Sequence, residues 1–286
     1  GRRLFQYPET TGDGEPKRTV TNHFPRMFTS PDGIRWRRNP DPILPFSLGS
    51  QRHILWDDRL DRWVVYLRGS RPANLFYTRV EIPKDGWDQP VAFSRKPGKA
   101  YADKAGKARA VLLEDELPIV LDIDDRDRPH ANIYSMNPWK LPDGHDAYVA
   151  FVPVWYKAPG SDKVEVQLAV SDDGVTWTRP WREPLIAPGA AGPQSAGQIW
   201  PVPDPVVRGD EVWLYVQTMP YNHLDFRSPQ PGQGATVRAV FGRNRFVAVE
   251  AVEPGAELVT RPLHVEGRRL ELNVEARSGR LRIALE

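Results

Sequence analysis

Two acidic segments of the sequence carry side chains that could perform acid–base chemistry. Residues 122–127 contain four closely spaced aspartates, the last of which is Asp127. Residues 164–170 form an apolar run that is interrupted by Glu165, and the alternation of a strand places this carboxylate on the same face as two further polar or small residues. Such carboxylates can act as proton donor, base or nucleophile. Other interpretations stay open: residues 122–127 could form a solvated loop or bind a structural Ca²⁺, and Glu165 could lie at a solvated strand edge.

A second group of residues could bind a polar ligand, because its members stand at the ends of predicted strands. The group comprises His53, His130, Asn132, Tyr134, Gln198, Trp200 and His223. A neutral imidazole can form hydrogen bonds or, together with carboxylates, hold a metal. Aromatic rings offer an apolar face on which a ligand can stack. Each histidine taken alone can also be an ordinary loop or core residue, and most of the ten tryptophans are expected to pack inside the fold.

The elements that position these side chains are predicted to be strands. The sequence has 29 prolines and 22 glycines, and the longest stretch without either residue runs from Ser50 to Arg68. Because an interior proline removes a backbone donor and clashes with the preceding turn, this spacing excludes a helical bundle and disfavours a regular α/β fold. Ten Trp, nine Tyr and ten Phe favour strands, whose pleated surface suits aromatic side chains.

Charge and hydropathy exclude several classes of partner. The 39 basic and 37 acidic residues are interspersed, so the net charge of +2 does not indicate a nucleic-acid surface. No apolar run of about 18 residues is present that would form a membrane-spanning helix. The chain has no cysteine, which excludes disulfides and thiolate metal sites. The first residues lack the apolar segment of a signal peptide, so an export signal would have to lie outside this chain.

One motif occurs twice. Residues Ser30–Trp36 read Ser-Pro-Asp-Gly-Ile-Arg-Trp, and residues Ser171–Trp177 read Ser-Asp-Asp-Gly-Val-Thr-Trp. Each copy follows an apolar strand and is followed by basic residues and a proline with an apolar pair. Asp-Gly between strand-forming residues predicts a tight hairpin turn, since glycine accepts a positive φ and aspartate bonds the nearby backbone. Agreement at four positions indicates a repeated structural unit.

Strand pairs around short turns recur along the chain and predict a β-propeller. Three units of about four strands are centred on residues 52–96, 130–181 and 198–251, the last of which ends with an added strand over residues 245–249. Residues 1–45 supply the outer strands of an earlier blade. The sequence therefore predicts an all-β protein whose propeller has five blades when intact.

The pattern of polar and apolar residues changes near residue 252. Residues 269–275 and 280–285 alternate polar and apolar side chains around Ser278-Gly279, which predicts an antiparallel hairpin with one wet face. We therefore divide the chain into a propeller over residues 1–252 with an incomplete first blade, and the beginning of a β-sandwich-like domain over residues 253–286. On this interpretation the chain is truncated at both ends.

The two Asp-Gly motifs resemble those of the five-bladed propeller glycosidases, of glycoside hydrolase families 32 and 43 and of the family 32 N-terminal-domain-like proteins in particular. Further matching segments are Trp63–Arg68, Pro118–Asp122 and Glu211–Tyr215. The resemblance covers most of the chain. The repeated motif indicates the architecture specifically, but it is only weak evidence for the reaction, because a fold does not determine a function.

The resemblance implies a funnel at the propeller axis that holds three carboxylates: an aspartate nucleophile or base, a glutamate acid and an aspartate that orients the sugar. The segment Arg126–Pro129 is similar to the Arg-Asp-Pro motif of family 32 with one extra residue, which assigns the orienting role to Asp127. Glu165 is the candidate acid. The Trp-Met-Asn-Asp-Pro-like nucleophile segment is absent, so the nucleophile stays unassigned, and Gln198 stands where a further carboxylate would be expected.

The predicted function is hydrolysis of the glycosidic bonds of a poly- or oligosaccharide by carboxylate acid/base chemistry in the funnel. The seven residues of the binding group would contact the sugar. No cofactor is expected, and neither nucleic acid nor a membrane is a predicted partner, whereas a missing blade could come from another segment or chain. A secreted or periplasmic location is expected. The alternative is a non-catalytic carbohydrate-binding or scaffold propeller.

Overall fold

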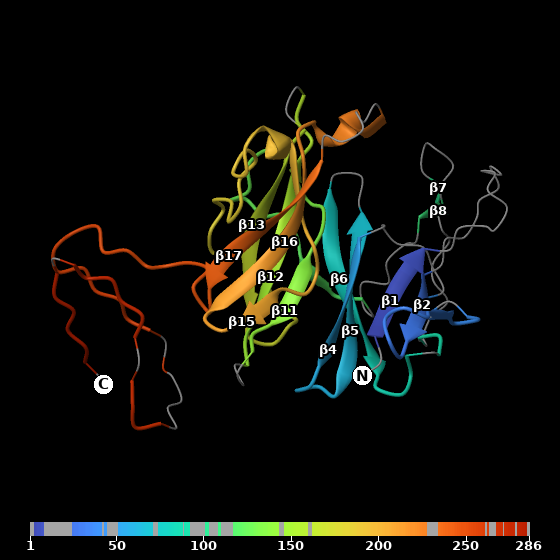
Figure 1. The fold of residues 1–286 in the computed structure, drawn as a ribbon, viewed down its shortest axis with the longest axis horizontal. Coiled ribbons are helices and arrows are strands. Elements are labelled where there is room, and N and C mark those ends of the chain that lie inside the picture. The colour runs from blue at the N-terminus through green and yellow to red at the C-terminus, as the bar shows by residue number, and fades with distance from the viewer. Residues whose placement is uncertain are drawn as a thin grey trace. The chain divides into compact units, whose positions relative to one another are not determined.

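The structure is a computed structural model. It describes residues 3–8, 25–41, 43–44, 51–70, 74–87, 89–91, 101–102, 108–109, 117–142, 146–159, 162–227, 234–260, 262, 267–270, 272–277 and 279–284. Over these residues the fold is all-β, as the sequence predicts, with two short 3₁₀-helices and no α-helix (Figure 1). No helix among them is long and apolar enough to cross a membrane.

The first sheet is antiparallel and has three strands in chain order. They are β1 (Arg3–Pro8), β2 (Pro25–Ser30) and β3 (Arg37–Arg38). A separate small pair is formed by β7 (Tyr101–Ala102) and β8 (Ala108–Arg109). The Asp-Gly motif joins β2 to β3, so its first copy closes a hairpin as predicted.

The second sheet begins with a hairpin in residues 50–68, the longest stretch without proline or glycine. Its strands β4 (Arg52–Asp57), β5 (Arg62–Ser70) and β6 (Leu75–Pro83) pair antiparallel in sequence order, and β9 (Ile119–Leu121) joins at the edge of β6. The turn between β4 and β5 is stabilised by the Asp57 carboxylate, which accepts a hydrogen bond of 3.1 Å from the Arg59 amide.

The third sheet is built around the long strand β12 (Tyr148–Tyr156). One edge of β12 pairs with β10 (Ala131–Ile133) and β11 (Asn137–Lys140), and the other edge pairs with β13 (Val164–Ser171). Thr178 returns beside Val170 after the second Asp-Gly motif, so this copy also closes a hairpin.

The fourth group of strands continues from the third through one parallel contact between Val164 and Gln198. It consists of β14 (Gln198–Pro201), β15 (Val206–Arg208), β16 (Glu211–Met219) and β17 (Ala235–Gly242), with β16 pairing to the other three. The 3₁₀-helices are η1 (Pro193–Ser195), which precedes β14, and η2 (His223–Arg227), which follows β16.

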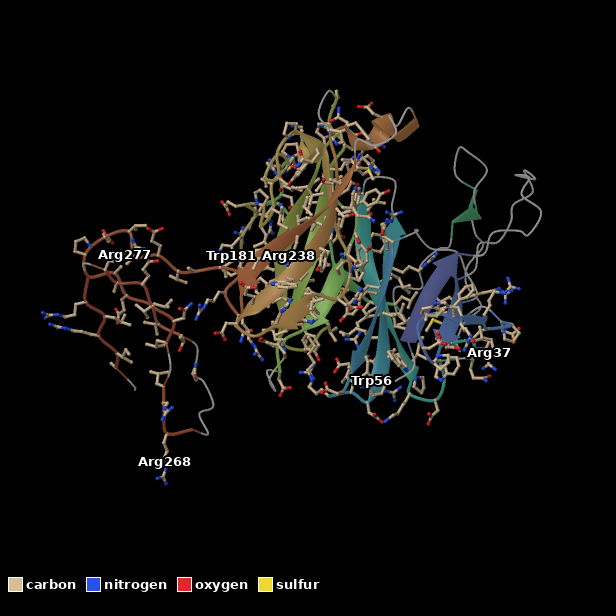
Figure 2. The ribbon with its side chains drawn as sticks, viewed as in Figure 1. Arg37, Trp56, Trp181, Arg238, Arg268 and Arg277 are labelled. Atoms are coloured by element: carbon tan, nitrogen blue, oxygen red, sulfur yellow. The ribbon has the colours of Figure 1, made fainter. Side chains whose placement is uncertain are left out.

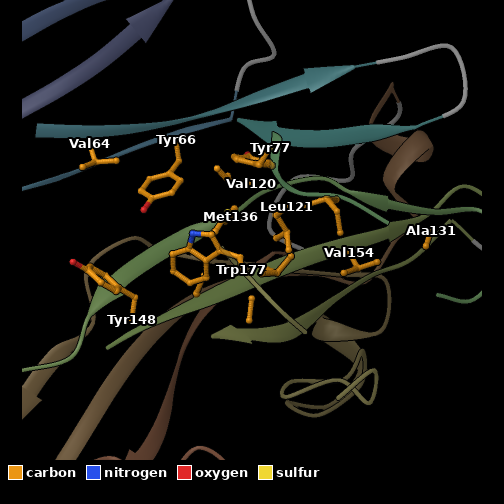
Figure 3. Close-up of a cluster of buried hydrophobic side chains, with 14 residues drawn as sticks. Val64, Tyr66, Tyr77, Val120, Leu121, Ala131, Met136, Tyr148, Val154 and Trp177 are labelled. Atoms are coloured by element: carbon orange, nitrogen blue, oxygen red, sulfur yellow. The ribbon is translucent and has the colours of Figure 1, made fainter. Parts of the chain in front are cut away.

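Both faces of the third sheet are covered by neighbouring sheets. Figure 3 shows one face, where Tyr66 and Tyr77 of the second sheet pack with Val154 and Trp177 in a buried apolar cluster. The opposite face packs against β14 and β16 through a second cluster that includes Phe151. Strand β12 is therefore apolar on both faces, and β13 is buried as well, with the polar Glu165 and Gln167 on the face that meets the second sheet.

Two predicted strand segments do not form strands among the described residues. After the bridge between Gly242 and Arg245 the chain leaves the sheet, so the strand predicted over residues 245–249 is wrong. The described parts of residues 269–285 likewise form no hairpin, and Leu270 and Leu281 are 57% and 54% exposed. A two-stranded ribbon is marginal when no other element covers its apolar face, and no described side chain of this segment is buried.

The chain divides into two compact units, residues Gly1–Phe246 and Val247–Glu286. The first contains all the strands that the structure describes. The second has no strand or helix among its described residues, and Arg268 and Arg277 in Figure 2 belong to it. That it begins a sandwich domain stays a prediction.

Candidate functional site

An aromatic cluster forms where β10, β12 and β14 come together at the same end of their sheets. It consists of Tyr134, Trp155, Trp200 and His223, whose rings contact one another edge to face or tilted. Tyr134 lies at the centre, with its ring centroid 5.6 Å from that of Trp155, 5.0 Å from that of Trp200 and 4.7 Å from that of His223. Trp155 is buried, and the other three are partly exposed. We call these four side chains the aromatic cluster.

Gln198 fixes two members of the aromatic cluster by hydrogen bonds. Its Oε1 accepts a hydrogen bond of 3.2 Å from the Trp200 indole and lies 3.0 Å from Nδ1 of His223. Its Nε2 donates to the backbone carbonyls of Tyr221 and Asn222. Because Gln198 is only 2% exposed and both ends of its amide are occupied, it orients the Trp200 and His223 rings instead of presenting its own amide to a ligand.

Asp162 is the carboxylate that contacts the aromatic cluster. It accepts hydrogen bonds from the Trp155 indole and from the Leu224 amide, and its backbone carbonyl accepts a hydrogen bond of 2.8 Å from the His223 amide. Asp162 thus ties η2 to β12 and fixes the position of the His223 ring. Sequence reasoning missed it, because an aspartate that precedes a strand gives no signal by itself.

The His223 ring is held in its neutral form. Burial lowers the pKa of His223 below its usual value, the Arg68 charge lowers it further, and the Asp162 carboxylate opposes this shift. A neutral imidazole keeps one donor and one acceptor nitrogen at neutral pH. Since Nδ1 faces Gln198, this contact sets the orientation of a ring that can serve as both donor and acceptor within the cluster.

The two predicted catalytic carboxylates lie in a different polar network, on the face of the third sheet that meets the second sheet. Glu165 on β13 accepts hydrogen bonds of 2.9 Å from the Tyr156 hydroxyl and the Gln167 amide, and its other oxygen lies 2.5 Å from Arg128. Burial, followed by the Glu165 charge, raises the pKa of Tyr156 to about 12, so this phenol stays protonated and donates to Glu165.

Asp127 is held by a buried guanidinium. Its two carboxylate oxygens lie 2.7 and 2.5 Å from the two terminal nitrogens of Arg179, and both side chains are almost fully buried. Arg179 also donates a hydrogen bond of 2.8 Å to Gln167 Oε1. A continuous chain of contacts therefore runs from Asp127 through Arg179 and Gln167 to Glu165, and we call it the carboxylate network.

A cavity of about 310 Å³ adjoins the carboxylate network. Its walls include β9, the aspartate-rich loop and residues 177–182, so that Arg179 and Arg182 face it. Arg182 pairs with the Asp124 carboxylate. Because Asp124 and Asp127 both turn toward arginines, the loop is organised by ion pairs. No group of three or more acidic or histidine side chains that could hold a metal occurs among the described residues.

The remaining predicted binding residues lie outside the aromatic cluster. His130 is exposed and has a positive φ of 67°, and its carbonyl accepts hydrogen bonds from the Asn132 side chain and the Lys157 amide. Asn132 is 7% exposed and also accepts a hydrogen bond from the Leu75 amide, which makes it a brace between two sheets. These two residues therefore shape the end of the third sheet.

His53 is buried beside β11, and its side chain is 3% exposed. Its Nε2 lies 4.0 Å from the exposed Asp204 carboxylate. Burial lowers the pKa of His53, and the charge of Asp204 and a contact with the Pro138 carbonyl raise it. A sugar could not reach this ring without displacing neighbouring side chains, so the predicted contact between His53 and substrate lacks structural support.

The fold of the chain is similar to that of glycoside hydrolases. A solved structure described as a glycoside hydrolase superimposes with a TM-score of 0.54 at 15% identity, covering 90% of this chain and 67% of that one. A second, described as a complex of BT0996 and RGII, superimposes with a TM-score of 0.52 at 14% identity and the same coverage. No protein-family model matches the sequence, and no curated protein matches it significantly. At these identities the similarity concerns the fold.

Proposed function

We propose that this protein is a glycoside hydrolase that holds a poly- or oligosaccharide against the aromatic cluster. The observation that carries the proposal is the convergence of Tyr134 and Trp155 from the pair of β10 and β12 with Trp200 and His223 from the pair of β14 and β16. Binding sites for small ligands combine aromatic walls with a few fixed polar groups. Here those polar groups are the neutral His223 ring and the side chains that surround it.

The arrangement suits a sugar better than a wholly apolar ligand. A sugar ring offers an apolar face that can lie on an indole or phenol, and hydroxyls that need hydrogen-bond partners. Trp200 and Tyr134 are partly exposed and provide the ring surfaces, and Gln198 keeps the Trp200 and His223 rings in place. Orientation of the rings before binding lowers the entropy cost of association.

Within this proposal Glu165 acts as the acid and Asp127 as an orienting residue. Glycoside hydrolysis needs one carboxyl group that donates a proton and a second that attacks the sugar or activates water. Glu165 pairs with Arg128, whose side chain is 59% exposed and also stacks on the Tyr156 ring. Asp127 is bound on both oxygens by Arg179, which suits a role in positioning Gln167 and thereby Glu165. The second reacting carboxylate stays unassigned.

The strand groups fit blades of a propeller, which we infer to be five-bladed. The second, third and fourth strand groups follow one another in the chain, and each packs its faces against the next. Their first strands, β4, β10 with β11, and β14, would then line the axis. A secreted or periplasmic location, where polysaccharides are met, fits this function.

The binding part of the proposal is tested with two tryptophan variants and a panel of plant, algal and microbial oligosaccharides. We expect Trp200→Ala to weaken binding at least about tenfold by isothermal titration calorimetry, because a stacking surface is lost. Trp213→Ala is the matched control: Trp213 lies on β16, where Arg208 and Arg238 stack on its ring, outside the aromatic cluster. Equal affinities of the two variants would contradict the proposed binding site.

The catalytic part is tested with a pair of glutamate variants. Glu165→Gln keeps the shape and hydrogen-bonding reach of the side chain but cannot donate a carboxyl proton, so we expect reducing-end release to fall about 100-fold or more while binding persists. Glu211→Gln, which alters an exposed carboxylate paired with the Trp213 indole, should release product at the wild-type rate. Undiminished turnover of the Glu165 variant would remove Glu165 from the mechanism.

A second candidate function, non-catalytic carbohydrate binding, is favoured by one specific observation. Gln198 stands at the start of β14, where the resemblance implies a carboxylate. Its side-chain amide contacts Trp200, His223 and the backbone. This alternative predicts that the wild-type protein binds members of the panel and releases no reducing ends from any of them.

A further inference from the structure

The outer face of the fourth strand group is lined by polar and aromatic side chains. We call outer face the surface formed by Arg208, Glu211, Trp213, Tyr215, Gln217 and Arg238. On β16 its residues alternate with Val212, Leu214 and Val216, which are buried on the opposite, apolar face. Tyr215 is 40% exposed, and both arginines are exposed as well. This alternation is typical of a sheet with one face on the core and the other in water.

Two arginines of the outer face stack on one indole. The guanidinium carbons of Arg208 on β15 and Arg238 on β17 lie 4.8 Å and 4.1 Å from the centroid of the Trp213 ring. Arg238 is labelled in Figure 2. The Trp213 indole donates a hydrogen bond of 2.7 Å to Glu211, which fixes the ring. Because both guanidiniums contact the same ring, they form a pair of cations held in place from two neighbouring strands.

These two guanidiniums have no polar partner among the described residues. Two other arginines that stack on rings also bind an acceptor: Arg68 donates a hydrogen bond to a backbone carbonyl, and Arg128 pairs with Glu165. Within the described part of the chain, Arg208 and Arg238 form neither a hydrogen bond nor an ion pair. Their charged donors are therefore open to an anionic ligand.

The outer face continues the surface of the aromatic cluster. Trp200 stands opposite Gln217 in the ladder between β14 and β16, and side chains opposite each other in a ladder share one face of the sheet. Tyr215 and then Trp213 follow along the same face. Since a strand rises about 3.3 Å per residue, Trp213 lies about 13 Å along β16 from Gln217. A continuous track therefore leads from Trp200 past Gln217 and Tyr215 to the two guanidiniums.

We propose that this track binds a long acidic saccharide, whose anionic groups meet Arg208 and Arg238 while another ring of the same chain lies in the aromatic cluster. A guanidinium presents paired donors that match the oxygens of a carboxylate or sulfate group. The exposed Tyr215 ring offers a surface on which an intervening sugar can lie. This inference rests on the proposed function, because it names the substrate class of the same site and extends that site along β16.

The outer face suits an acidic saccharide better than a nucleic acid. Surfaces that bind nucleic acids carry a patch or stripe of many basic residues, whereas this face has two arginines beside the acidic Glu211. Bases also need an aromatic face for stacking, and the Trp213 ring is already contacted by both guanidiniums. A saccharide with charges spaced along its chain requires no more than these two cations.

The test compares ligands that differ in length and in charge. A dimer and an octamer of galacturonic acid, and the methyl esters of both, are titrated calorimetrically into the wild-type protein at low and at high salt. The dimer is too short to reach from Trp200 to the guanidiniums. We therefore expect the octameric acid to bind about fivefold more tightly than its ester, and the dimers to differ by less than about twofold. High salt should remove the gain, since exposed charges are then screened.

Charge variants locate this gain on the outer face. The double variant Arg208→Gln with Arg238→Gln should bind the octameric acid no better than its ester and should leave binding of both dimers unchanged. The corresponding double lysine variant should retain part of the preference, because the charge remains without the planar donors. Arg35→Gln with Arg37→Gln is the matched control: it removes the same charge from exposed positions and should bind as wild type does. Circular dichroism verifies that each variant is folded.

Two further measurements identify the supporting ring and the kind of anion. Trp213→Ala removes the ring that holds both guanidiniums, so it should weaken binding of the octameric acid and leave binding of uncharged saccharides unchanged. A sulfated galactose octamer is compared with the octameric acid. Tighter binding of the sulfated ligand would support an anionic saccharide and assign sulfate as its charged group, whereas tighter binding of the acid would assign the carboxylate.

The outcomes that contradict the inference differ from those that contradict the proposed function. Equal affinity of the octameric acid and its ester, an unchanged preference in the double glutamine variant, or tighter binding of an oligothymidylate than of any acidic saccharide would overturn the acidic track. Binding of the dimers at the aromatic cluster would be unaffected by these results. Absence of binding for every acid and ester would instead overturn the proposed function on which the track depends.

Discussion

The two Asp-Gly motifs have the same local structure and different surroundings. In both copies the serine hydroxyl accepts a hydrogen bond from the glycine amide, 2.8 Å for Gly33 and 2.9 Å for Gly174. In both, the aspartate accepts from the two amides that follow the glycine. Both glycines have a positive φ, 77° and 70°. Yet Trp36 is 43% exposed and Trp177 only 7%.

The difference arises from which groups contact the turn. In the first copy the Gly33 carbonyl accepts a hydrogen bond from the Trp36 indole of its own motif. In the second, the Gly174 carbonyl accepts hydrogen bonds from Tyr66 and Arg79 of the second sheet. Arg59 likewise donates to the carbonyls of residues 172 and 173. The same turn is thus a surface loop in one place and a docking point between two sheets in the other.

The residues that follow the two motifs differ in the same way. Two positions after each tryptophan stands an arginine, Arg38 in the first copy and Arg179 in the second. Arg38 is exposed, whereas Arg179 is buried and binds Asp127. The segment after the second copy therefore places the Arg179 guanidinium in the carboxylate network. In this copy the structural repeat also positions a candidate catalytic residue.

Substitution of these arginines should give the largest difference in stability between the two copies. Arg179→Ala removes the guanidinium that binds both oxygens of the buried Asp127 and leaves it only Arg182, at 3.4 Å, and the Asp124 amide, which should lower the free energy of unfolding by about 3 kcal/mol. Arg38→Ala changes an exposed position and should cost less than about 0.5 kcal/mol. Urea unfolding followed by circular dichroism measures both. Similar losses in the two variants would show that the Asp127 pair contributes little to stability.

The two tryptophan variants should differ less in unfolding free energy than the two arginine variants. Trp177→Ala removes a buried ring and should cost about 3 kcal/mol, at the low end for such a change because Trp177 already borders the cavity. Trp36→Ala should cost less than about 1 kcal/mol, since nearly half of this residue stays in water in the folded protein. Thermal unfolding of the two variants gives the comparison, and a greater loss for Trp36→Ala would contradict our account of the core.

The glycines test the turn itself. A β-carbon at either position meets an unfavourable positive φ, which costs about 1 kcal/mol. At Gly174 the added carbon would also lie 3.1 Å from the Tyr66 hydroxyl, so Gly174→Ala should cost about 2 kcal/mol and Gly33→Ala about half as much. Equal losses of unfolding free energy in the two variants, measured by urea unfolding, would mean that the Tyr66 side chain moves away from the added carbon without destabilising the fold.

Most strands could be predicted from the sequence because their signals are local. The turns at Asp57-Asp58 and at the Asp-Gly motifs are set by side chains that bond the adjacent backbone, and the flanking apolar runs then form strands. The strand predicted over residues 245–249 did not form, although the outer edge of β17 pairs with no described strand; after the bridge from Gly242 to Arg245, Phe246 packs against Phe151 and Phe241 instead. A local pattern specifies that a segment can form a strand; it does not specify whether the fold pairs that segment with an open edge.

The candidate site could be predicted only in part, for the same reason. The sequence names Tyr134, Gln198, Trp200 and His223 because they stand at or near strand ends, and the structure brings their side chains together; that they bind a ligand stays a prediction. Arg68 and Asp162 were missed, since their roles depend on contacts between distant segments: a ring from the end of β10 for Arg68, and an indole and a helix amide for Asp162. Which of many aspartates and arginines pair across a fold is a tertiary property that spacing does not encode.

The smallest expected contrast between the two motifs is their response to acid. Burial raises the pKa of Asp173, but the amides of Thr176 and Val175 and the hydroxyls of Ser171 and Thr176 lower it to about 2. The pKa of Asp32 is lowered by the amides of Arg35 and Ile34 and by Ser30. Because the folded-state pKa lies below that of the unfolded chain, each carboxylate stabilises the fold above about pH 4, and that contribution is lost as the pH falls toward 2.

Protonation of Asp173 should destabilise the fold more than protonation of Asp32, because it also weakens the turn to which the second sheet is bound through Arg59. The contribution of the partly exposed Asp173 is below about 1 kcal/mol because solvent screens it. Asp173→Asn should therefore flatten the fall in melting temperature between about pH 4 and pH 2.5, and Asp32→Asn should flatten it less. An unchanged acid slope in Asp173→Asn would mean that other carboxylates determine the acid sensitivity of the fold.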